Sequence, residues 1–449
     1  MKVKILSRNP DDYLRATKLD IHKVPRNYSR EQHPFQEARE YSRALNAVKL
    51  GRLFAKPFLA SLSGHSEGVS VLTKHEQALS LLLSGSYDGE VRIWDLPRKR
   101  CLAHLQAHTG WIRGLVVEPV EGQSFISVGD DKQIKHWRLL TEPGNSGEAY
   151  PEPLFAVISK SALLGLSHHW KRPQFATCGD SVQIWDHHRA SPIRALDWGV
   201  DSVYRIAYNR VETELLGGVA SDRAILLYDA RAKVPLHRTL MRLRSNAFVW
   251  NPMEAFVFSV ASEDYNCYTF DMRQMGKPLN VHMDHTEAVM DLDYSPTGRE
   301  LVSGSYDRSI RIFPLDKGRS REVYHTKRMQ RVMSVSWSAD AKFIVSGSDE
   351  MNLRLWKANA SEKLGPVRPR ESRAFEYQAK LADKFAHHPQ VSRIVRHRQV
   401  PGHIRGAARE HRVIRESQKR KEANRRKHSK AGSVPYKAER AKHVLREED

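Results

Sequence analysis

The sequence has few cysteines and no long apolar run. Its three cysteines, Cys101, Cys178 and Cys267, stand far apart. They predict neither a disulfide framework nor a paired C-x-x-C zinc site, and they fit a reducing compartment. No stretch of 18 apolar residues occurs, which argues against a membrane-spanning helix. The first twenty residues also lack the apolar core of a secretory signal.

Motifs of catalysis and metal binding are missing as well. The chain has no H-E-x-x-H pair and no G-x-x-x-x-G-K-S/T phosphate loop. Its 22 histidines include side-by-side pairs at 168–169, 187–188 and 387–388. Adjacent residues point to opposite faces of a strand or diverge on a helix, so such pairs rarely ligate one ion. We therefore predict no metal, no cofactor and no enzymatic activity.

Positive charge is abundant and unevenly placed. The formal net charge is +21. Residues 357–449 contain 25 Lys and Arg against 11 Asp and Glu, and residues 1–50 contain 11 against 6. The middle of the chain is nearly neutral. Basic tails on a neutral body usually meet nucleic acid or an acidic partner surface, and the alternative is a merely solvated tail.

A repeated string organises the neutral middle. GSYDGEVRIWD at 85–95 returns almost unchanged as GSYDRSIRIF at 304–313. Alignment on this string gives seven copies, spaced by 43, 48, 43, 42, 43 and 43 residues, that each end in an aromatic residue: Trp94, Trp137, Trp185, Tyr228, Phe270, Phe313 and Trp356. Each aromatic follows an Asp-containing turn, and a GH or H-T pair opens several copies. This pattern is typical of WD repeats, with four strands per blade.

The seven copies predict an all-β fold, a seven-bladed WD-repeat β-propeller over residues 58–356. A basic N-terminal arm with an amphipathic helix, residues 1–57, precedes the propeller, and a basic α-helical C-terminal tail, residues 357–449, follows it. The last copy stops at Trp356, whereas strand-like FLASL at 58–62 precedes the first copy. We therefore predict that residues 58–62 supply the outer strand of the last blade, which removes an open sheet edge.

Polar residues recur at fixed offsets from the aromatic positions. Blades one and two offer matching sets: His65, Ser84, Asp88 and Trp94, then His108, Ser127, Asp131 and Trp137. Ser, His and Asp together could form a nucleophilic triad. We favour a hydrogen-bonded chain that ties turns to strands, because an active site does not need several copies of itself. Blades three to seven depart from the pattern, so we expect them to depend more on packing.

Both tails contain helical patterns. An apolar stripe predicts a helix over 33–56 that packs either on the side of the propeller or into a partner: Phe35, Ala38, Tyr41, Leu45 and Val48. A second helix is predicted from the spacing of Ala374, Tyr377, Leu381 and Phe385, and a third over 404–428. We expect residues 1–32 to form an extended arm, and both tails to be largely disordered until they bind.

The third predicted helix ends in a dense group of cations. We name these the tail cations: Lys419, Arg420, Lys421, Arg425, Arg426, Lys427 and Lys430. Helical geometry spreads them around much of the circumference. They could contact RNA phosphates or serve as a nuclear or nucleolar address, and the two roles are compatible. Tyr436 is the sole aromatic residue after position 400, which argues against recognition by base stacking.

An aromatic-Asp-x-Arg box closes blades four and five. The boxes read YDAR at 228–231 and FDMR at 270–273. Asp229 with Arg231, and Asp271 with Arg273, could simply pair at a strand end. The same box is the pattern by which WD proteins dock on the damage-binding adaptor of cullin–RING ligases, so both interpretations stay open.

Several stretches carry a family resemblance beyond the repeat: HPFQEAREYSRALNAVKLGRLFAKPF at 33–58, NPMEAFVFSVASEDYNCYTFDMR at 251–273, REVYHTKRMQRVMSVSW at 321–337, SDEMNLRLWKANASEKLG at 348–365 and KRKEANRRKHSKAGSVP at 419–435. On these the chain resembles the Sof-type WD-repeat family of the small-subunit processome.

This resemblance implies a non-enzymatic scaffold in pre-rRNA processing and small ribosomal subunit biogenesis. It implies a monomer within a large complex in the nucleus and nucleolus. Its expected partners are pre-rRNA, the box C/D small nucleolar ribonucleoprotein and processome proteins. Vertebrate members of the family are also substrate receptors of a cullin–RING ubiquitin ligase. The resemblance therefore also favours adaptor docking through Arg231 and Arg273.

Overall fold

The chain forms two compact units in the computed structural model. One unit combines the chain up to Pro57 with Asn359–Arg398, and the other combines Phe58–Ala358 with Gln399–Asp449. The sequence-based division kept 357–449 together as one tail, whereas contacts divide this segment between the two units. No helix among the described residues is long and apolar enough to cross a membrane. The structure describes residues 35–139, 152–197, 199–232, 235–430 and 432–448, and the arm expected at 1–32 lies outside them.

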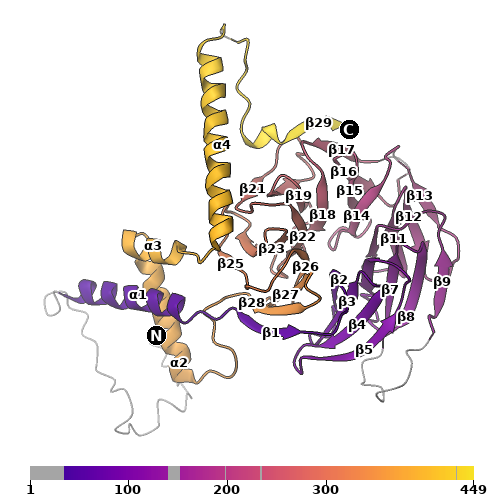
Figure 1. Ribbon diagram of the computed structural model, residues 1–449, viewed down its shortest axis with the longest axis horizontal. Helices are drawn as coiled ribbons and strands as arrows, with labels where there is room; N and C mark the ends of the chain where they lie inside the picture. Colours follow the sequence, from indigo (N-terminus) through magenta and orange to yellow (C-terminus); the bar gives the residue numbers. More distant parts are fainter. Residues whose placement is uncertain (1–34, 140–151, 198, 233–234, 431, 449) are drawn as a thin grey trace, which may run out of the picture. The chain divides into compact units, whose positions relative to one another are not determined.

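Seven antiparallel sheets form the ring of the larger unit (Figure 1). Each blade begins with its innermost strand. Blades one to three contain β2 (Val69–Lys74), β3 (Leu81–Ser86), β4 (Glu90–Asp95) and β5 (Arg100–Gln106); β6 (Ile112–Val117), β7 (Ser124–Gly129), β8 (Gln133–Arg138) and β9 (Phe155–Ile158); β10 (Gly165–His168), β11 (Gln174–Cys178), β12 (Val182–Asp186) and β13 (Arg194–Leu196).

Blades four to seven complete the ring. They contain β14 (Val203–Tyr208), β15 (Leu215–Ala220), β16 (Ala224–Asp229) and β17 (His237–Met241); β18 (Ser245–Trp250), β19 (Val257–Ser262), β20 (Asn266–Asp271) and β21 (Asn280–Met283); β22 (Val289–Tyr294), β23 (Glu300–Ser305), β24 (Ile310–Pro314) and β25 (Glu322–Tyr324); β26 (Val332–Trp337), β27 (Phe343–Ser348), β28 (Leu353–Lys357) and β1 (Phe58–Leu62). The predicted seven-bladed fold is confirmed.

The ring closes as predicted, because the first strand of the propeller completes the last blade. Strand β1 pairs antiparallel with β28, with Leu62 opposite Leu353 and Phe58 opposite Trp356. Leu62 is buried in one cluster with Val69 and Trp94 of blade one and with residues of blade seven. The two ends of the propeller are thus joined both by backbone pairing and by a shared apolar core.

The polar chain forms as predicted in blade two. The Nε2 atom of His108 lies 2.8 Å from Ser127 Oγ, and its Nδ1 lies 2.9 Å from Asp131 Oδ1. The indole N–H of Trp137 donates to the same Ser127 oxygen at 3.0 Å. One serine hydroxyl therefore joins the strand that carries the aromatic residue to the turn that opens the blade.

Blade one departs from the prediction at Asp88. His65 Nε2 and Trp94 Nε1 meet Ser84 Oγ at 2.6 and 2.8 Å, as in blade two. The carboxylate of Asp88, however, accepts the hydroxyls of Ser66 and Ser86, together with the N–H of Glu90. These nearby donors occupy Asp88, and the link from His65 to Asp88 is not made.

The expectation that blades three to seven depend more on packing was too general. Blade six keeps both histidine links, His285 Nε2 to Ser303 Oγ at 2.6 Å and His285 Nδ1 to Asp307 Oδ2 at 2.8 Å, although Phe313 replaces the tryptophan. Blades three and seven keep the indole link instead, to a threonine or serine hydroxyl at 2.9 Å in each. Different blades therefore keep different links of the polar chain, and apolar packing replaces the links that are missing.

The C-terminal segment adds a fifth strand to blade four, which we did not predict. Strand β29 (Val444–Glu448) follows the short helix η2 (Arg440–Lys442) and pairs antiparallel with β17 (Figure 1). Val444 is buried opposite Met241, in the apolar core that blade four shares with blade five. Arg238 on β17 forms ion pairs with both Asp222 and Glu448.

The smaller unit is a helical cluster of α1 (Gln36–Leu53), α2 (Pro369–Lys384) and α3 (Pro389–Arg396). Tyr41 of α1 donates its hydroxyl proton to Gln390 at 2.6 Å, and Glu40 pairs with Lys384 at 2.7 Å. The apolar stripe of α1 thus packs on helices of the C-terminal segment, which was neither of the two alternatives that we expected. These contacts hold the three helices together, and disorder of the tails before binding stays an expectation. Helix α3 was not predicted.

Candidate functional site

The two Asp-x-Arg boxes lie on the same face of the ring. Asp229 ends β16 and Asp271 ends β20, the third strands of adjacent blades. Equivalent strands run in the same direction in every blade of a propeller, so their ends share one face. The side chains of Arg231 and Arg273 are 68% and 66% exposed.

Each arginine pairs with the aspartate of its own box. Arg273 donates to Asp271 through Nε at 3.1 Å and through Nη2 at 2.8 Å, and this hydrogen bonding lowers the pKa of Asp271. Its guanidinium also lies 4.7 Å from the centre of the Phe256 ring. Arg231 lies 3.4 Å from Asp229. A guanidinium carries five N–H donors, so local pairing holds each arginine in position and leaves donors for a partner.

The tail cations lie at the end of α4 (Gly402–Lys427), close to the predicted third helix, and on the residues after it. Six of the seven side chains are exposed, while Arg426 is half-buried, 5.0 Å from the ring centre of Tyr436. Helical geometry spreads the six cations that lie within α4 around the helix. A cylinder of exposed cations suits contact with phosphates from several directions.

Helix α4 is anchored to blade five near its middle and to the returning chain further along. His411 stacks on Tyr265 with ring centres 5.1 Å apart, and Arg415 contacts the sulfur of Met283 at 3.5 Å. Further along, Lys419 pairs with Glu439 at 3.0 Å, and Glu422 pairs with Lys442. The segment that ends in β29 therefore braces the helix that carries the tail cations.

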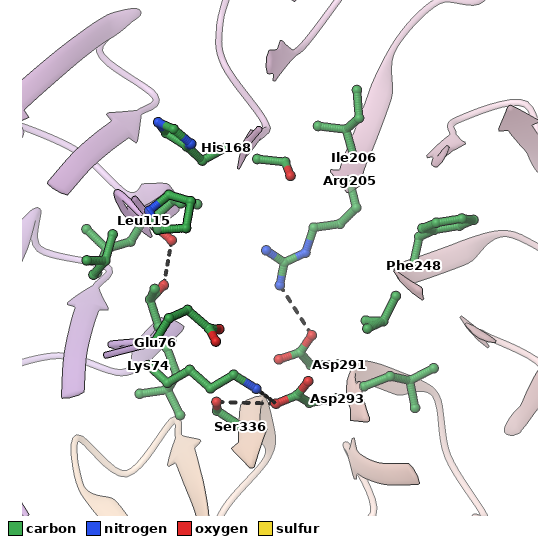
Figure 2. A pocket seen from close by; sticks show the side chains of 18 of the residues that line it. Lys74, Glu76, Leu115, His168, Arg205, Ile206, Phe248, Asp291, Asp293 and Ser336 are labelled. Carbon is green, nitrogen blue, oxygen red and sulfur yellow. Dashed lines mark hydrogen bonds and ion pairs between the residues drawn. The ribbon is translucent and has the colours of Figure 1, made fainter. Parts of the chain in front are cut away.

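A polar pocket of about 260 Å³ lies among the inner strands of the ring (Figure 2). Two ion pairs cross it, Lys74 with Asp293 and Arg205 with Asp291, at 3.3 and 3.4 Å. Asp291 also accepts the N–H of Val335 at 2.9 Å, yet burial raises the pKa of this carboxyl group to about 6. Charged groups contributed by separate blades therefore pair with one another in this pocket.

The Ser–His–Asp sets of blades two and six are not accessible to a substrate. The imidazoles of His108 and His285 are fully buried, and Ser127 and Ser303 are fully buried as well. Nucleophilic catalysis requires a hydroxyl that the substrate can reach. The structure therefore supports the structural interpretation of these residues.

The adjacent residues His168 and His169 contact different partners, and His168 meets a histidine that is distant in sequence. In the pair 168–169, His169 accepts backbone N–H groups of its own turn, whereas His168 faces His187. His187 and His136 also lie beside Glu118. Sequence reasoning missed this group because its members come from different blades, and only the predicted blade register could have brought them together.

These features define a WD-repeat β-propeller with an attached basic helical tail. A model of the WD domain, G-beta repeat, matches residues 56–95, 99–138, 276–313 and 321–357, and a model of the Sof1-like domain matches residues 358–444. The chain belongs to the Sof1-like family of WD-repeat proteins.

Relatives support this assignment over nearly the whole chain. The chain is 57% identical to DDB1- and CUL4-associated factor 13 of Mus musculus over 445 residues, and 56% identical to the protein of that name in Homo sapiens, with 99% of each chain covered. It is 41% identical to Protein SOF1 of Saccharomyces cerevisiae, with 99% of this chain and 94% of that protein covered. The family predicted from the sequence is confirmed.

A solved structure supports the fold alone. The WD40 beta propeller domain of Doa1 superposes with a TM-score of 0.57 at 19% identity, covering 67% of this chain and 96% of that one.

Proposed function

We propose that the chain is a non-enzymatic scaffold of the small-subunit processome, acting in pre-rRNA processing and small ribosomal subunit biogenesis in the nucleolus. The observation that carries this proposal is the exposed tail cations on a helix braced against a closed ring. Membership of the Sof1-like family supports it, as does the similarity to Protein SOF1. The proposed partners are pre-rRNA, the box C/D small nucleolar ribonucleoprotein and processome proteins.

In this proposal the ring is a platform and α4 provides the RNA contact. Exposed Lys and Arg side chains bind phosphates without reading base sequence, and each contact releases counterions. Specificity for the particle then comes from the protein surfaces of the ring and from the geometry in which α4 is presented.

Removing three tail cations is expected to weaken RNA binding. In the variant Lys421→Gln with Arg425→Gln and Lys427→Gln, affinity for single-stranded pre-rRNA fragments should fall about tenfold or more. The slope of log affinity against log salt should decrease by about 2, since each lost phosphate contact contributes about 0.7. Fluorescence anisotropy titrations at several salt concentrations measure both quantities.

The matched control removes three exposed cations from the ring, Arg98, Lys99 and Arg100, each changed to Gln. If the two triple variants weaken RNA binding equally, the loss of affinity comes from the lower net charge and not from the tail cations in particular. A nuclear import signal fused to the tail variant separates the two roles left open by the sequence. If the fusion restores co-sedimentation with pre-ribosomal particles, the tail cations act as an address and RNA contact is rejected.

A second function is favoured by the exposed boxes on adjacent blades. Relatives that are 54–57% identical carry the name DDB1- and CUL4-associated factor 13. We therefore also propose that the chain is a substrate receptor of a cullin–RING ligase and docks on its adaptor through Arg231 and Arg273. The two functions use different surfaces and can coexist.

The variant Arg231→Ala with Arg273→Ala is expected to lose adaptor binding by at least about thirtyfold, because even one buried interface arginine contributes about 2 kcal/mol or more. Surface plasmon resonance with the purified adaptor measures the loss. The control is Arg98→Ala with Arg189→Ala, which removes exposed arginines after β4 and β12 that lack the box spacing. If the box variant binds the adaptor with unchanged affinity, Arg231 and Arg273 serve only in local pairing with the aspartates of their own boxes.

A further inference from the structure

Two histidines and a glutamate meet where blade two adjoins blade three. Glu118 follows β6, His136 lies on β8, and His187 follows β12. One ligand atom of each lies within 4.8 Å of the other two. Neither the ring's polar chains nor the functions proposed above use these side chains.

One imidazole nitrogen of this group is available to bind a ligand. The Nε2 atom of His136 is buried, with no hydrogen-bond partner among the described residues. A buried nitrogen of this kind is costly unless something binds it. Glu118 accepts the hydroxyl proton of Ser124 through Oε2 at 2.6 Å, and a carboxylate has a second oxygen to offer.

A third histidine fixes the proton of His187. The Nδ1 atom of His168 lies 2.6 Å from the carbonyl oxygen of His169, which can only accept, so this nitrogen carries the proton. The bare Nε2 of His168 lies 2.8 Å from Nε2 of His187. His187 therefore donates from Nε2 and keeps its lone pair on Nδ1. Histidines that ligate metals commonly have their second N–H held by such an outer partner.

We infer that Glu118, His136 and His187 bind a divalent first-row cation, with Zn²⁺ the best match, at the seam between blades two and three. Two imidazoles and one carboxylate form a three-ligand zinc set that leaves a position for water. Glu118 and His136 belong to blade two and His187 to blade three, so the ion would join neighbouring blades. Its role there would be to stabilise the ring, because it would hold side chains of two neighbouring blades together.

Zinc retention by the untagged full-length chain tests this inference. After chelator treatment, dialysis against Zn²⁺ and gel filtration, mass spectrometry of the eluted protein should find one zinc per chain. Zn²⁺ should also raise the melting temperature of the treated protein. Glu118→Gln and His187→Asn should each lose the bound zinc and the thermal shift. His104→Asn, which removes an exposed histidine on β5, should keep both.

The inference is wrong if the chelator-treated wild type retains no zinc, or if Glu118→Gln retains as much as the wild type. Should both variants fail to fold, Co²⁺ added to the wild type still decides. Visible bands of low-coordinate Co²⁺ support the site, and a spectrum identical to aqueous Co²⁺ rejects it.

Discussion

Deletion of Phe58–Leu62 is expected to lower the melting temperature of the ring by about 10 °C or more. The deletion removes the whole strand β1 and leaves β28 as an open edge. It takes away several ladder hydrogen bonds, worth about 1 kcal/mol each, and the buried Leu62, worth about 2 kcal/mol. A loss near 5 kcal/mol corresponds to a shift of about 10–20 °C in a large domain.

Differential scanning calorimetry measures the shift in melting temperature. A pair of point variants then distinguishes the loss of ring closure from nonspecific destabilisation. Leu62→Asp places a charge in the apolar core between blades seven and one, whereas Ser61→Asp places the same charge on the exposed neighbouring position. We expect a large decrease in melting temperature for the first and little change for the second. A deletion variant that melts within about 2 °C of the wild type would show that β1 does not hold the ring closed.

Asp307→Ala is expected to destabilise the ring by about 3–5 kcal/mol, because it removes one partner from a fully buried pair. The side chains of His285 and Asp307 are 0% and 1% exposed. The carboxylate also accepts the hydroxyl and the N–H of Ser309, at 2.6 and 3.0 Å. Without it these donors and the ring N–H of His285 stay buried and unsatisfied. Urea unfolding followed by circular dichroism measures the loss.

The same carboxyl group gives a pH dependence of known sign. Burial by itself would raise the pKa of Asp307, but His285, Arg311 and Ser309 hold it well below its usual range. A depressed pKa in the folded state contributes stability above the unfolded value near 4, and this contribution is lost as the pH falls below that value. The wild type should therefore lose more stability than Asp307→Asn between about pH 5 and pH 3.

Two other aspartates provide the comparison. Asp316→Asn alters an exposed residue in the same blade and should change stability by less than about 0.5 kcal/mol. Asp88→Asn in blade one should have an intermediate effect, since Asp88 does not contact His65. If Asp307→Asn costs no more than Asp316→Asn, the buried pair is not a major support of blade six.

The repeat made the ring predictable because the aromatic position recurs with a nearly constant period. The closing strand followed from a simple count, since the last copy lacked an outer strand and FLASL stood unassigned. The link from His65 to Asp88 failed because neighbouring serines bind Asp88, a competition that spacing does not reveal. The two boxes can be read directly from the sequence, but spacing alone could not show that each arginine is both locally paired and exposed, and their role in docking stays a prediction.

The tail was harder to predict because its partners are distant in sequence. The segment VLREE at 444–448 has little apolar alternation, so its sequence does not predict a strand. It forms a strand by pairing with β17. The apolar stripe of α1 indicated that something covers it, while the identity of α2 and α3 as that cover depends on tertiary contacts. The group of Glu118, His136 and His187 was missed for the same reason, because three separate loop and strand positions meet only when two blades are side by side.

Pairing of β1 with β28 has a consequence for synthesis on the ribosome. Leu62 pairs with Leu353, so almost the entire propeller must be translated between the two partners. At about 5–20 residues per second, roughly 15–60 s pass before the first-made strand can meet the last-made one. Each nascent chain therefore carries an unpaired strand through this interval. Its short length limits association with other nascent chains until the ring closes.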